Sequence, residues 1–131
     1  MRYVFISYKF SDRELAHSID SFFQPQGGQC QGKAAFVKND VADQGSAAIE
    51  REIQEVMRGC VAVLFIVGDD SHNSPWIEYE AKLARSWEKP MFAVRHPGAA
   101  GGPPNEIRNE ISAVLQWSQN VLCDALNAVN P

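Results

Sequence analysis

The chain has 131 residues, a formal net charge of −4, and 45% hydrophobic and 21% charged residues. This length and composition predict one folded domain over 1–131 with a core of its own. The acidic balance, with lysines and arginines scattered singly, disfavours a nucleic acid or a membrane surface as the main partner, and no apolar run is long enough for a secretory signal or a membrane span. We therefore expect a cytoplasmic protein.

The first half of the chain alternates strand-like and helix-like segments. The first strand is a short apolar run, and the helix after it begins with Ser11 and Glu14 at the spacing of a capping box. The expected elements are a strand at 3–7, a helix at 11–24, a strand at 34–37, a polar loop at 38–45 and a helix at 46–58.

The second half continues the alternation. Residues 60–67 are apolar without interruption, which is typical of a strand that is covered on both faces. We expect this segment to be the central strand. The other expected elements are a helix at 75–88, a strand at 90–95, a loop at 96–105, a short helical turn at 106–111, a strand at 113–117 and a closing helix from about 121.

Strands joined by helical crossovers normally lie parallel, with right-handed connections. The sequence thus predicts an α/β fold, a three-layer sandwich around a parallel sheet of about five strands. Ligands of such sheets bind beyond the carboxyl ends of the strands. The segments expected at that edge are 7–12, 38–45, 68–74 and the chain from His96 onward.

One carboxylate interrupts an apolar helix face. Trp76, Leu83, Ala84 and Trp87 recur at helical spacing, and Glu80 falls in the same stripe. A structural interpretation is partial exposure of Glu80 or pairing with a core arginine. A functional interpretation is a carboxylate with an altered pKa, held in a cleft near the strand ends to meet a ligand. The position alone leaves both open.

The sequence lacks the residue patterns of several other kinds of functional site. Cys30, Cys60 and Cys123 include no C-x-x-C pair and indicate neither a disulfide framework nor a zinc site, and the three histidines lack metal-ligand spacing. We therefore expect no metal. The first strand is followed by no glycine, which excludes a P-loop or a dinucleotide fingerprint. A response-regulator receiver would need acidic residues where Ser7 stands.

Four features recur along the chain, namely a first-strand motif, a central apolar strand, a tryptophan–glutamate pair and the residues before the fourth strand: Phe5-Ile6-Ser7-Tyr8 with Ser11-Asp12, 60–67, Trp76 with Glu80, and Lys89-Pro90. Together these motifs resemble a TIR domain over nearly the whole chain. Within that group the sequence is most similar to the bacterial TIR-like proteins of Thoeris antiphage defence, of the ThsB type.

The resemblance implies a flavodoxin-like sandwich and an enzyme that cleaves the nicotinamide–ribose bond of NAD+. By motif matching, Glu80 is the expected catalytic residue. Ser7, Tyr8 and Asp12 would border the substrate, Trp76 would support the site, and 38–45 would be a loop that closes over it. NAD+ would be the substrate, with no further cofactor.

One carboxylate is chemically sufficient for this reaction. Nicotinamide leaves NAD+ as a neutral molecule and needs no general acid, unlike the alkoxide of ordinary glycosides. An anion held beside the ribose can stabilise the oxocarbenium-like centre. Without donors such as Ser7, the apolar wall would raise the pKa of Glu80. His72 and His96 lie near the expected edge, although a loop histidine is more often simply solvated.

The product depends on the acceptor: water gives ADP-ribose, and an internal nucleophile gives a cyclic isomer. The resemblance favours synthesis of such a signal for a separate effector protein, with self-association on activation. The alternative is a non-catalytic TIR interaction and assembly module, which has no need of a carboxylate in an apolar stripe. A nucleoside deoxyribosyltransferase-like enzyme is a third interpretation, made less favourable by Trp76 and the first-strand motif.

Overall fold

The computed structural model describes residues 2–9, 12–23, 32–37, 46–69, 75–104, 111 and 114–129. Strands and helices alternate along these residues, as the sequence predicts. In chain order they are β1 (Tyr3–Ser7), α1 (Arg13–Ser18), η2 (Ile19–Phe22), β2 (Lys33–Ala35), α2 (Ser46–Arg58), β3 (Ala62–Val67), α3 (Pro75–Ser86), β4 (Met91–Arg95), β5 (Val114–Leu115) and α4 (Gln119–Asn127).

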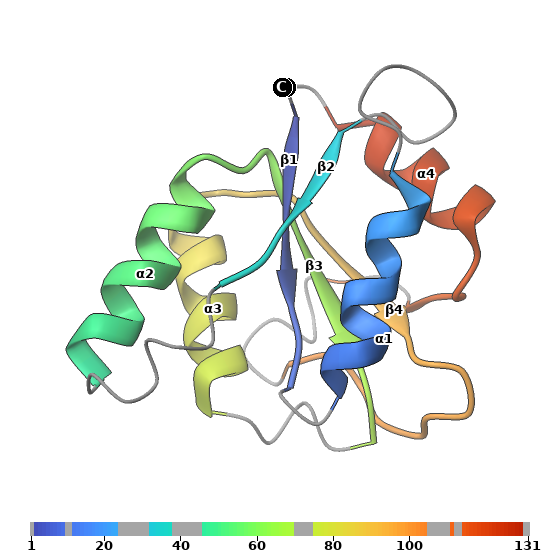
Figure 1. The fold of residues 1–131 in the computed structure, drawn as a ribbon, viewed down its shortest axis with the longest axis horizontal. Helices are drawn as coiled ribbons and strands as arrows, with labels where there is room; N and C mark the ends of the chain where they lie inside the picture. The colour runs from blue at the N-terminus through green and yellow to red at the C-terminus, as the bar shows by residue number, and fades with distance from the viewer. Residues whose placement is uncertain are drawn as a thin grey trace.

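The five strands form one parallel sheet in the order β2-β1-β3-β4-β5 (Figure 1). Ser7 at the end of β1 lies in register with Phe65 of β3. All six residues of β3 are buried, which confirms it as the central strand and explains its uninterrupted apolar sequence. The predicted three-layer flavodoxin-like architecture is therefore confirmed.

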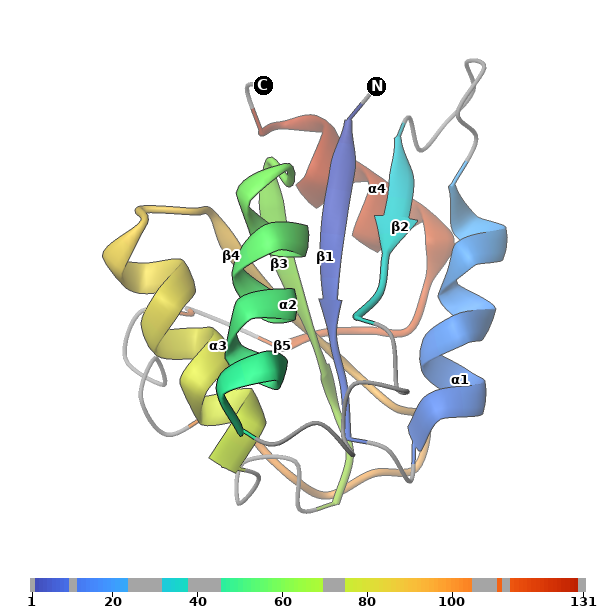
Figure 2. The same cartoon turned by 60° about the vertical axis from the view of Figure 1, so that its left-hand side comes forward.

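Helices cover the sheet on both faces, with α1 and α4 on one side and α2 and α3 on the other (Figure 2). Successive side chains of β1 point to opposite faces of the sheet, so they enter the two hydrophobic cores, one on each face, in turn. Val4 and Ile6 pack with Ala16 and Ile19 on the α1 side. Phe5 packs with the α2 and α3 residues on the opposite side. Ser7, two residues after Phe5, consequently faces α3.

The first predicted helix differs from the structure in its second half. The helix expected at 11–24 is α1 followed by a single 3-10 turn, η2, because the last turn tightens before the chain becomes extended at Phe23. Asp12 is the residue before α1, and its side chain makes no capping hydrogen bond. Ser11, the expected cap, lies outside the described residues. The turn expected at 106–111 lies outside them too, except for Ile111.

The cysteines also differ from expectation, because Cys123 is disulfide-bonded. Sequence spacing could not show this, since a disulfide depends on which distant segments the fold brings together. Cys60 is a free, buried thiol. Burial raises its pKa to about 11, with Lys89 acting in the opposite direction. Cys60 is therefore an unreactive core residue at neutral pH.

The loop after β4 folds back onto the end of β3. Arg95 donates a hydrogen bond of 2.6 Å to the Gly101 carbonyl, and the Ala100 amide donates one of 3.0 Å to Asp69 Oδ1. Gly101 is buried, and a Cβ at this position would collide with the backbone oxygens of Gly68 and Asp69. A glycine is required here by close backbone approach.

Among the described residues, no helix has both the length and the apolar character needed to cross a bilayer.

We predict that Gly101→Ala lowers the free energy of unfolding by about 1–3 kcal/mol, the usual cost of overpacking. Two backbone segments that already touch would have to separate to admit the methyl group. Gly102→Ala is the matched control, because a Cβ there meets nothing within 4 Å. Urea unfolding of both variants gives the comparison. Equal stabilities for the two would contradict the tight packing of this loop.

Candidate functional site

The carboxyl ends of β1 and β3 form the point where the chain's connections diverge. The connection after β1 leads to α1 on one face of the sheet, and the connection after β3 leads to α3 on the other (Figure 2). In parallel sheets such a reversal leaves a crevice between the two loops, and ligands bind there. Ser7 ends β1, and Trp76 and Glu80 lie on α3 after β3, so these predicted site residues come from both of the elements that meet at this point.

Ser7, the last residue of β1, and Glu80 of α3 are in contact. Ser7 Oγ donates a hydrogen bond of 3.0 Å to Glu80 Oε1. Ser7 is 1% exposed and Glu80 is 6% exposed, and they are the buried polar residues of the described chain. Glu80 lies inside the apolar face of α3, with Ile77, Ala81 and Ala84 also buried. The structure thus brings the predicted catalytic residue together with one predicted substrate-binding residue.

The apolar surroundings govern the protonation of Glu80. Burial raises the pKa of Glu80 to about 8, because the charged carboxylate loses its hydration. The hydrogen bond from Ser7 acts in the opposite direction and lowers the pKa by stabilising the anion. One donor does not offset the desolvation. Glu80 is therefore mainly protonated at neutral pH in the unliganded protein, and a cationic ligand beside it would favour ionisation.

Trp76 lies one turn before Glu80 on α3 and is half-buried. Its indole packs edge-on against Tyr79, with ring centroids 5.8 Å apart. The Tyr79 hydroxyl accepts a hydrogen bond of 2.9 Å from Gln54 Nε2 on α2. These contacts connect the first turn of α3 to α2 and so fix the direction in which α3 presents Glu80. The buried stripe of α3 is centred on Ile77 and Ala81, while Trp76 is at its margin.

Asp12 approaches the crevice from the α1 side. Its carboxylate lies against Gly68, where an added Cβ would fall 2.5 Å from Asp12 Oδ2. A turn closed by the Asp12 amide, which donates to the Lys9 carbonyl at 2.8 Å, holds it there. Asp12 thus contacts the chain just after β3, and neither Gly68 nor this contact could be inferred from sequence spacing.

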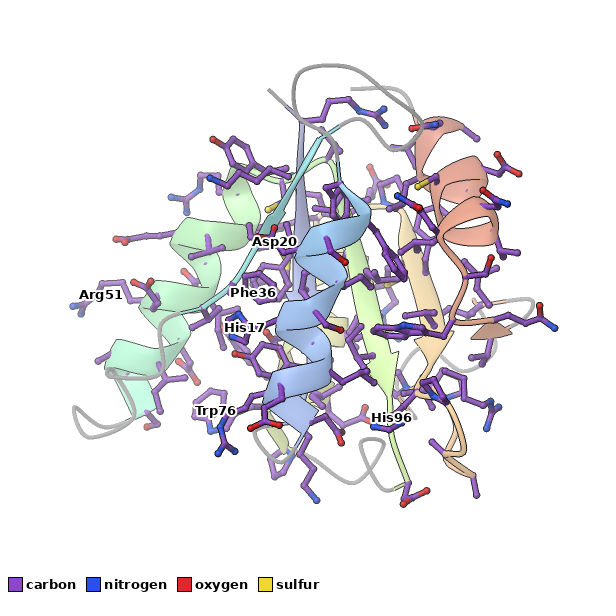
Figure 3. The ribbon with its side chains drawn as sticks, turned by 45° about the vertical axis from the view of Figure 1, so that its right-hand side comes forward. His17, Asp20, Phe36, Arg51, Trp76 and His96 are labelled. Atoms are coloured by element: carbon purple, nitrogen blue, oxygen red, sulfur yellow. The ribbon has the colours of Figure 1, made fainter. Side chains whose placement is uncertain are left out.

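Tyr8 lies on the other face of the sheet from Glu80. Its ring packs edge-on against His17 and Phe36, and His17 stacks on Phe36 with ring centroids 4.2 Å apart. The Tyr8 hydroxyl is 3.4 Å from His17 Nε2. Figure 3 shows His17 and Phe36 side by side next to α1, apart from Trp76. In this arrangement Tyr8 and His17 form part of the α1-side packing.

The other expected parts of the site differ in how far the structure describes them. His72 and the loop at 38–45, apart from its flanks, lie outside the described residues. His96 is described and follows β4 at the same edge. Over the described part of the chain, histidine, cysteine, aspartate and glutamate side chains form no group of three that could hold a metal ion.

A parallel sheet in the order 2-1-3-4-5 with helices on both faces is a flavodoxin-like fold, the architecture expected of a TIR-like domain. The protein-family model described as "Thoeris protein ThsB, TIR-like domain" matches residues 5–101, which is most of the chain. The chain therefore belongs to the ThsB TIR-like family of Thoeris antiphage defence. No curated protein matches it.

The raised pKa of Glu80 predicts an unusual pH dependence of stability. The folded protein holds a proton on Glu80 up to about pH 8, whereas the unfolded chain loses it near 4.5. Between these values the unfolded state binds fewer protons, so Glu80 makes stability fall by roughly 1.4 kcal/mol per pH unit as pH rises. Below the lower value and above the upper one, the contribution is constant.

Glu80→Gln replaces the protonated acid by a neutral isostere and should remove this contribution. We expect the free energy of unfolding of the variant to increase relative to that of the wild type as pH rises from 5 to 8. Urea unfolding of both proteins at several pH values measures this difference. Other titrating groups affect both proteins alike and cancel in the difference. A stability difference independent of pH would show that Glu80 titrates normally.

Proposed function

We propose that the protein is an NAD+-consuming enzyme that breaks the bond between nicotinamide and ribose and releases an open or cyclic ADP-ribose-type signal. The observation that carries this proposal is the buried Glu80 carboxyl group, hydrogen-bonded to Ser7 at the carboxyl end of β1. A folded protein rarely buries a glutamate without a charged partner unless the residue has a task. Membership of a TIR-like family supports NAD+ as the substrate.

The chemistry follows from the charge of the substrate. The ribosyl C1′–N bond of NAD+ breaks with its electron pair going to the nicotinamide nitrogen, which becomes neutral. The positive charge passes to the ribose as an oxocarbenium-like centre. An ionised Glu80 would stabilise that centre through space and through the ribose hydroxyls. A water or substrate hydroxyl then adds to C1′ and releases its proton.

The raised pKa of Glu80 couples binding to ionisation. The nicotinamide ring is cationic, and a cation near a carboxyl group favours the charged form. NAD+ would therefore displace the proton from Glu80 as it binds. Ser7 would remain as the donor that keeps the resulting carboxylate oriented, and Trp76 would hold the start of α3 in place through Tyr79.

The same family membership supports a role in signalling. We propose a separate effector protein, which senses the product, as a partner. Self-association on activation is a further proposal that rests on the family resemblance.

The burial of Glu80 favours a second candidate function, a non-catalytic TIR interaction and assembly module. A carboxyl group that is 6% exposed and protonated at neutral pH could serve only to bond Ser7 and connect α3 to β1. On this interpretation Glu80→Gln would keep the full function of the protein in defence. The two candidates are separated by the following experiment.

We expect concentrated wild-type protein to release nicotinamide from NAD+, and Glu80→Gln to reduce the rate by about 10²–10³-fold, the range found when one preorganised electrostatic group is removed. Glu78→Gln is the matched control, since it lies on the same helix but is not among its buried residues. Chromatography with mass detection would follow nicotinamide and every adenine-containing product. Equal rates for wild type and Glu80→Gln would reject the catalytic role.

We also expect kcat/KM for NAD+ to rise with pH up to about 8, because this ratio reports the ionisation of the free enzyme. The reaction requires the anion, and each pH unit below the pKa of Glu80 lowers the ionised fraction about tenfold. Ser7→Ala removes the donor and should move the midpoint to higher pH. A rate that does not change between pH 6 and 8 would contradict control by Glu80.

A further inference from the structure

The helix α4 carries the disulfide-bonded Cys123 in the hydrophobic core on the α1 side of the sheet. Cys123 is 0% exposed, and its Sγ lies 4.0 Å from the Phe22 carbonyl oxygen at the end of η2. The same carbonyl accepts a hydrogen bond of 3.1 Å from Gln119 Nε2 at the start of α4. The first half of α4 is therefore held against the end of η2, from which the chain continues to β2.

The sequence limits the choice of the second sulfur in this disulfide. The chain has three cysteines, Cys30, Cys60 and Cys123. Cys60 is a free thiol, and it belongs to the core on the α2 and α3 side, so the sheet separates it from Cys123. Within one chain the count leaves Cys30. Cys30 lies outside the described residues, and its assignment depends on this count and on the reach of the chain.

The contacts of Arg2 show that the chain can reach from Cys30 to Cys123. Gly32 packs on the backbone of Arg2, since a Cβ added to this glycine would fall 2.8 Å from the Arg2 carbonyl oxygen. The guanidinium of Arg2 donates a hydrogen bond of 2.8 Å to the Leu126 carbonyl in α4. Cys30 is two residues before Gly32, a separation of at most about 7 Å. Cys123 is three residues before Leu126, about one helical turn. The start of β2 also lies next to α4 in both ribbon views (Figures 1 and 2).

The core around Cys123 accepts the thiol as well as the disulfide. A reduced cysteine packs as a small apolar side chain, and its S–H would have the Phe22 carbonyl as an acceptor. The thiolate is disfavoured there because burial removes its hydration, as it does for Cys60. Attack by a thiol on Cys123 needs access to a buried sulfur, and attack on Cys30 leaves the negative charge on that buried sulfur. Both routes require α4 to open.

We propose that Cys30 and Cys123 form a reversible disulfide that locks α4 to the chain preceding β2, and that reduction of this bond lets α4 open. The proposal is independent of the proposed function. A dithiol reductant supplies two electrons and two protons. Its first thiolate attacks the S–S bond and forms a mixed disulfide, and its second thiol displaces the protein sulfur. Both cysteines end as thiols, and the reductant ends as a disulfide.

Thiol labelling in denaturant tests the assignment of the bond. Protein purified without reductant and then unfolded should react with an alkylating reagent at Cys60, while Cys30 and Cys123 are recovered as one linked pair of peptides. After treatment with dithiothreitol, all three cysteines should be labelled. Labelling of all three without reductant, or a disulfide that joins two chains, would overturn the assignment.

Thermal unfolding and hydrogen exchange test the lock on α4. The bond closes a loop of roughly 90 residues, and cross-links over such lengths strongly restrict the unfolded chain. We therefore expect dithiothreitol to lower the Tm of the wild type by about 5–15 °C. Amide exchange in α4 should become about tenfold faster or more, a larger change than in α2 or α3.

Three variants separate the lock from other effects of the reductant. Cys30→Ser leaves the buried Cys123 side chain in place, so it should match the reduced wild type and not respond to dithiothreitol. Cys123→Ala should also be insensitive to the reductant. Cys60→Ala is the matched control and should respond like the wild type.

Reversibility provides the last measurement. Removal of dithiothreitol and reoxidation of the wild type should restore the original Tm. Equal Tm and equal exchange of α4 with and without reductant would overturn the proposal. Loss of the whole fold in dithiothreitol would overturn it too, because the disulfide would then be a permanent requirement for folding and not a reversible lock.

Discussion

The burial of β3 on both faces is the constraint on which the arrangement of this domain depends. A strand whose six residues are all buried needs helices on both sides of the sheet, so successive crossovers must divide between the two faces. That division sends the chain after β1 to α1 and the chain after β3 to α3. Ser7 at the end of β1 and Glu80 on α3 face each other because of this topology.

The apolar surroundings of the Glu80–Ser7 pair determine which protonation state of Glu80 the folded protein favours. A carboxyl group enclosed by the apolar α3 layer is neutral in the free protein, and the uncharged form costs little to bury. On the proposed function, the anion would form only when a cationic substrate replaces the lost solvation. In an enzyme, the fold would then limit the ionised form of Glu80 to the complex with substrate. In an assembly module, the same hydrogen bond would connect α3 to β1 and no ionisation would be needed.

At the carboxyl edge of the sheet, the loop after β4 packs closely against the backbone that follows β3. Gly68 accommodates Asp12 on one side and Gly101 on the other, and Arg95 and Asp69 hold the returning loop. These contacts place His96 opposite the start of α1.

The sequence by itself determined the order and type of the elements, the central strand and the anomaly at Glu80, because these depend on local periodicity and hydrophobic continuity. The family followed from motifs that are short and contiguous. Only the tertiary structure decided that Ser7 bonds Glu80, that Tyr8 lies on the opposite face, that Asp12 contacts Gly68 and that Cys123 is disulfide-bonded. Each of these depends on strand register and loop path, which bring together residues that no sequence spacing relates.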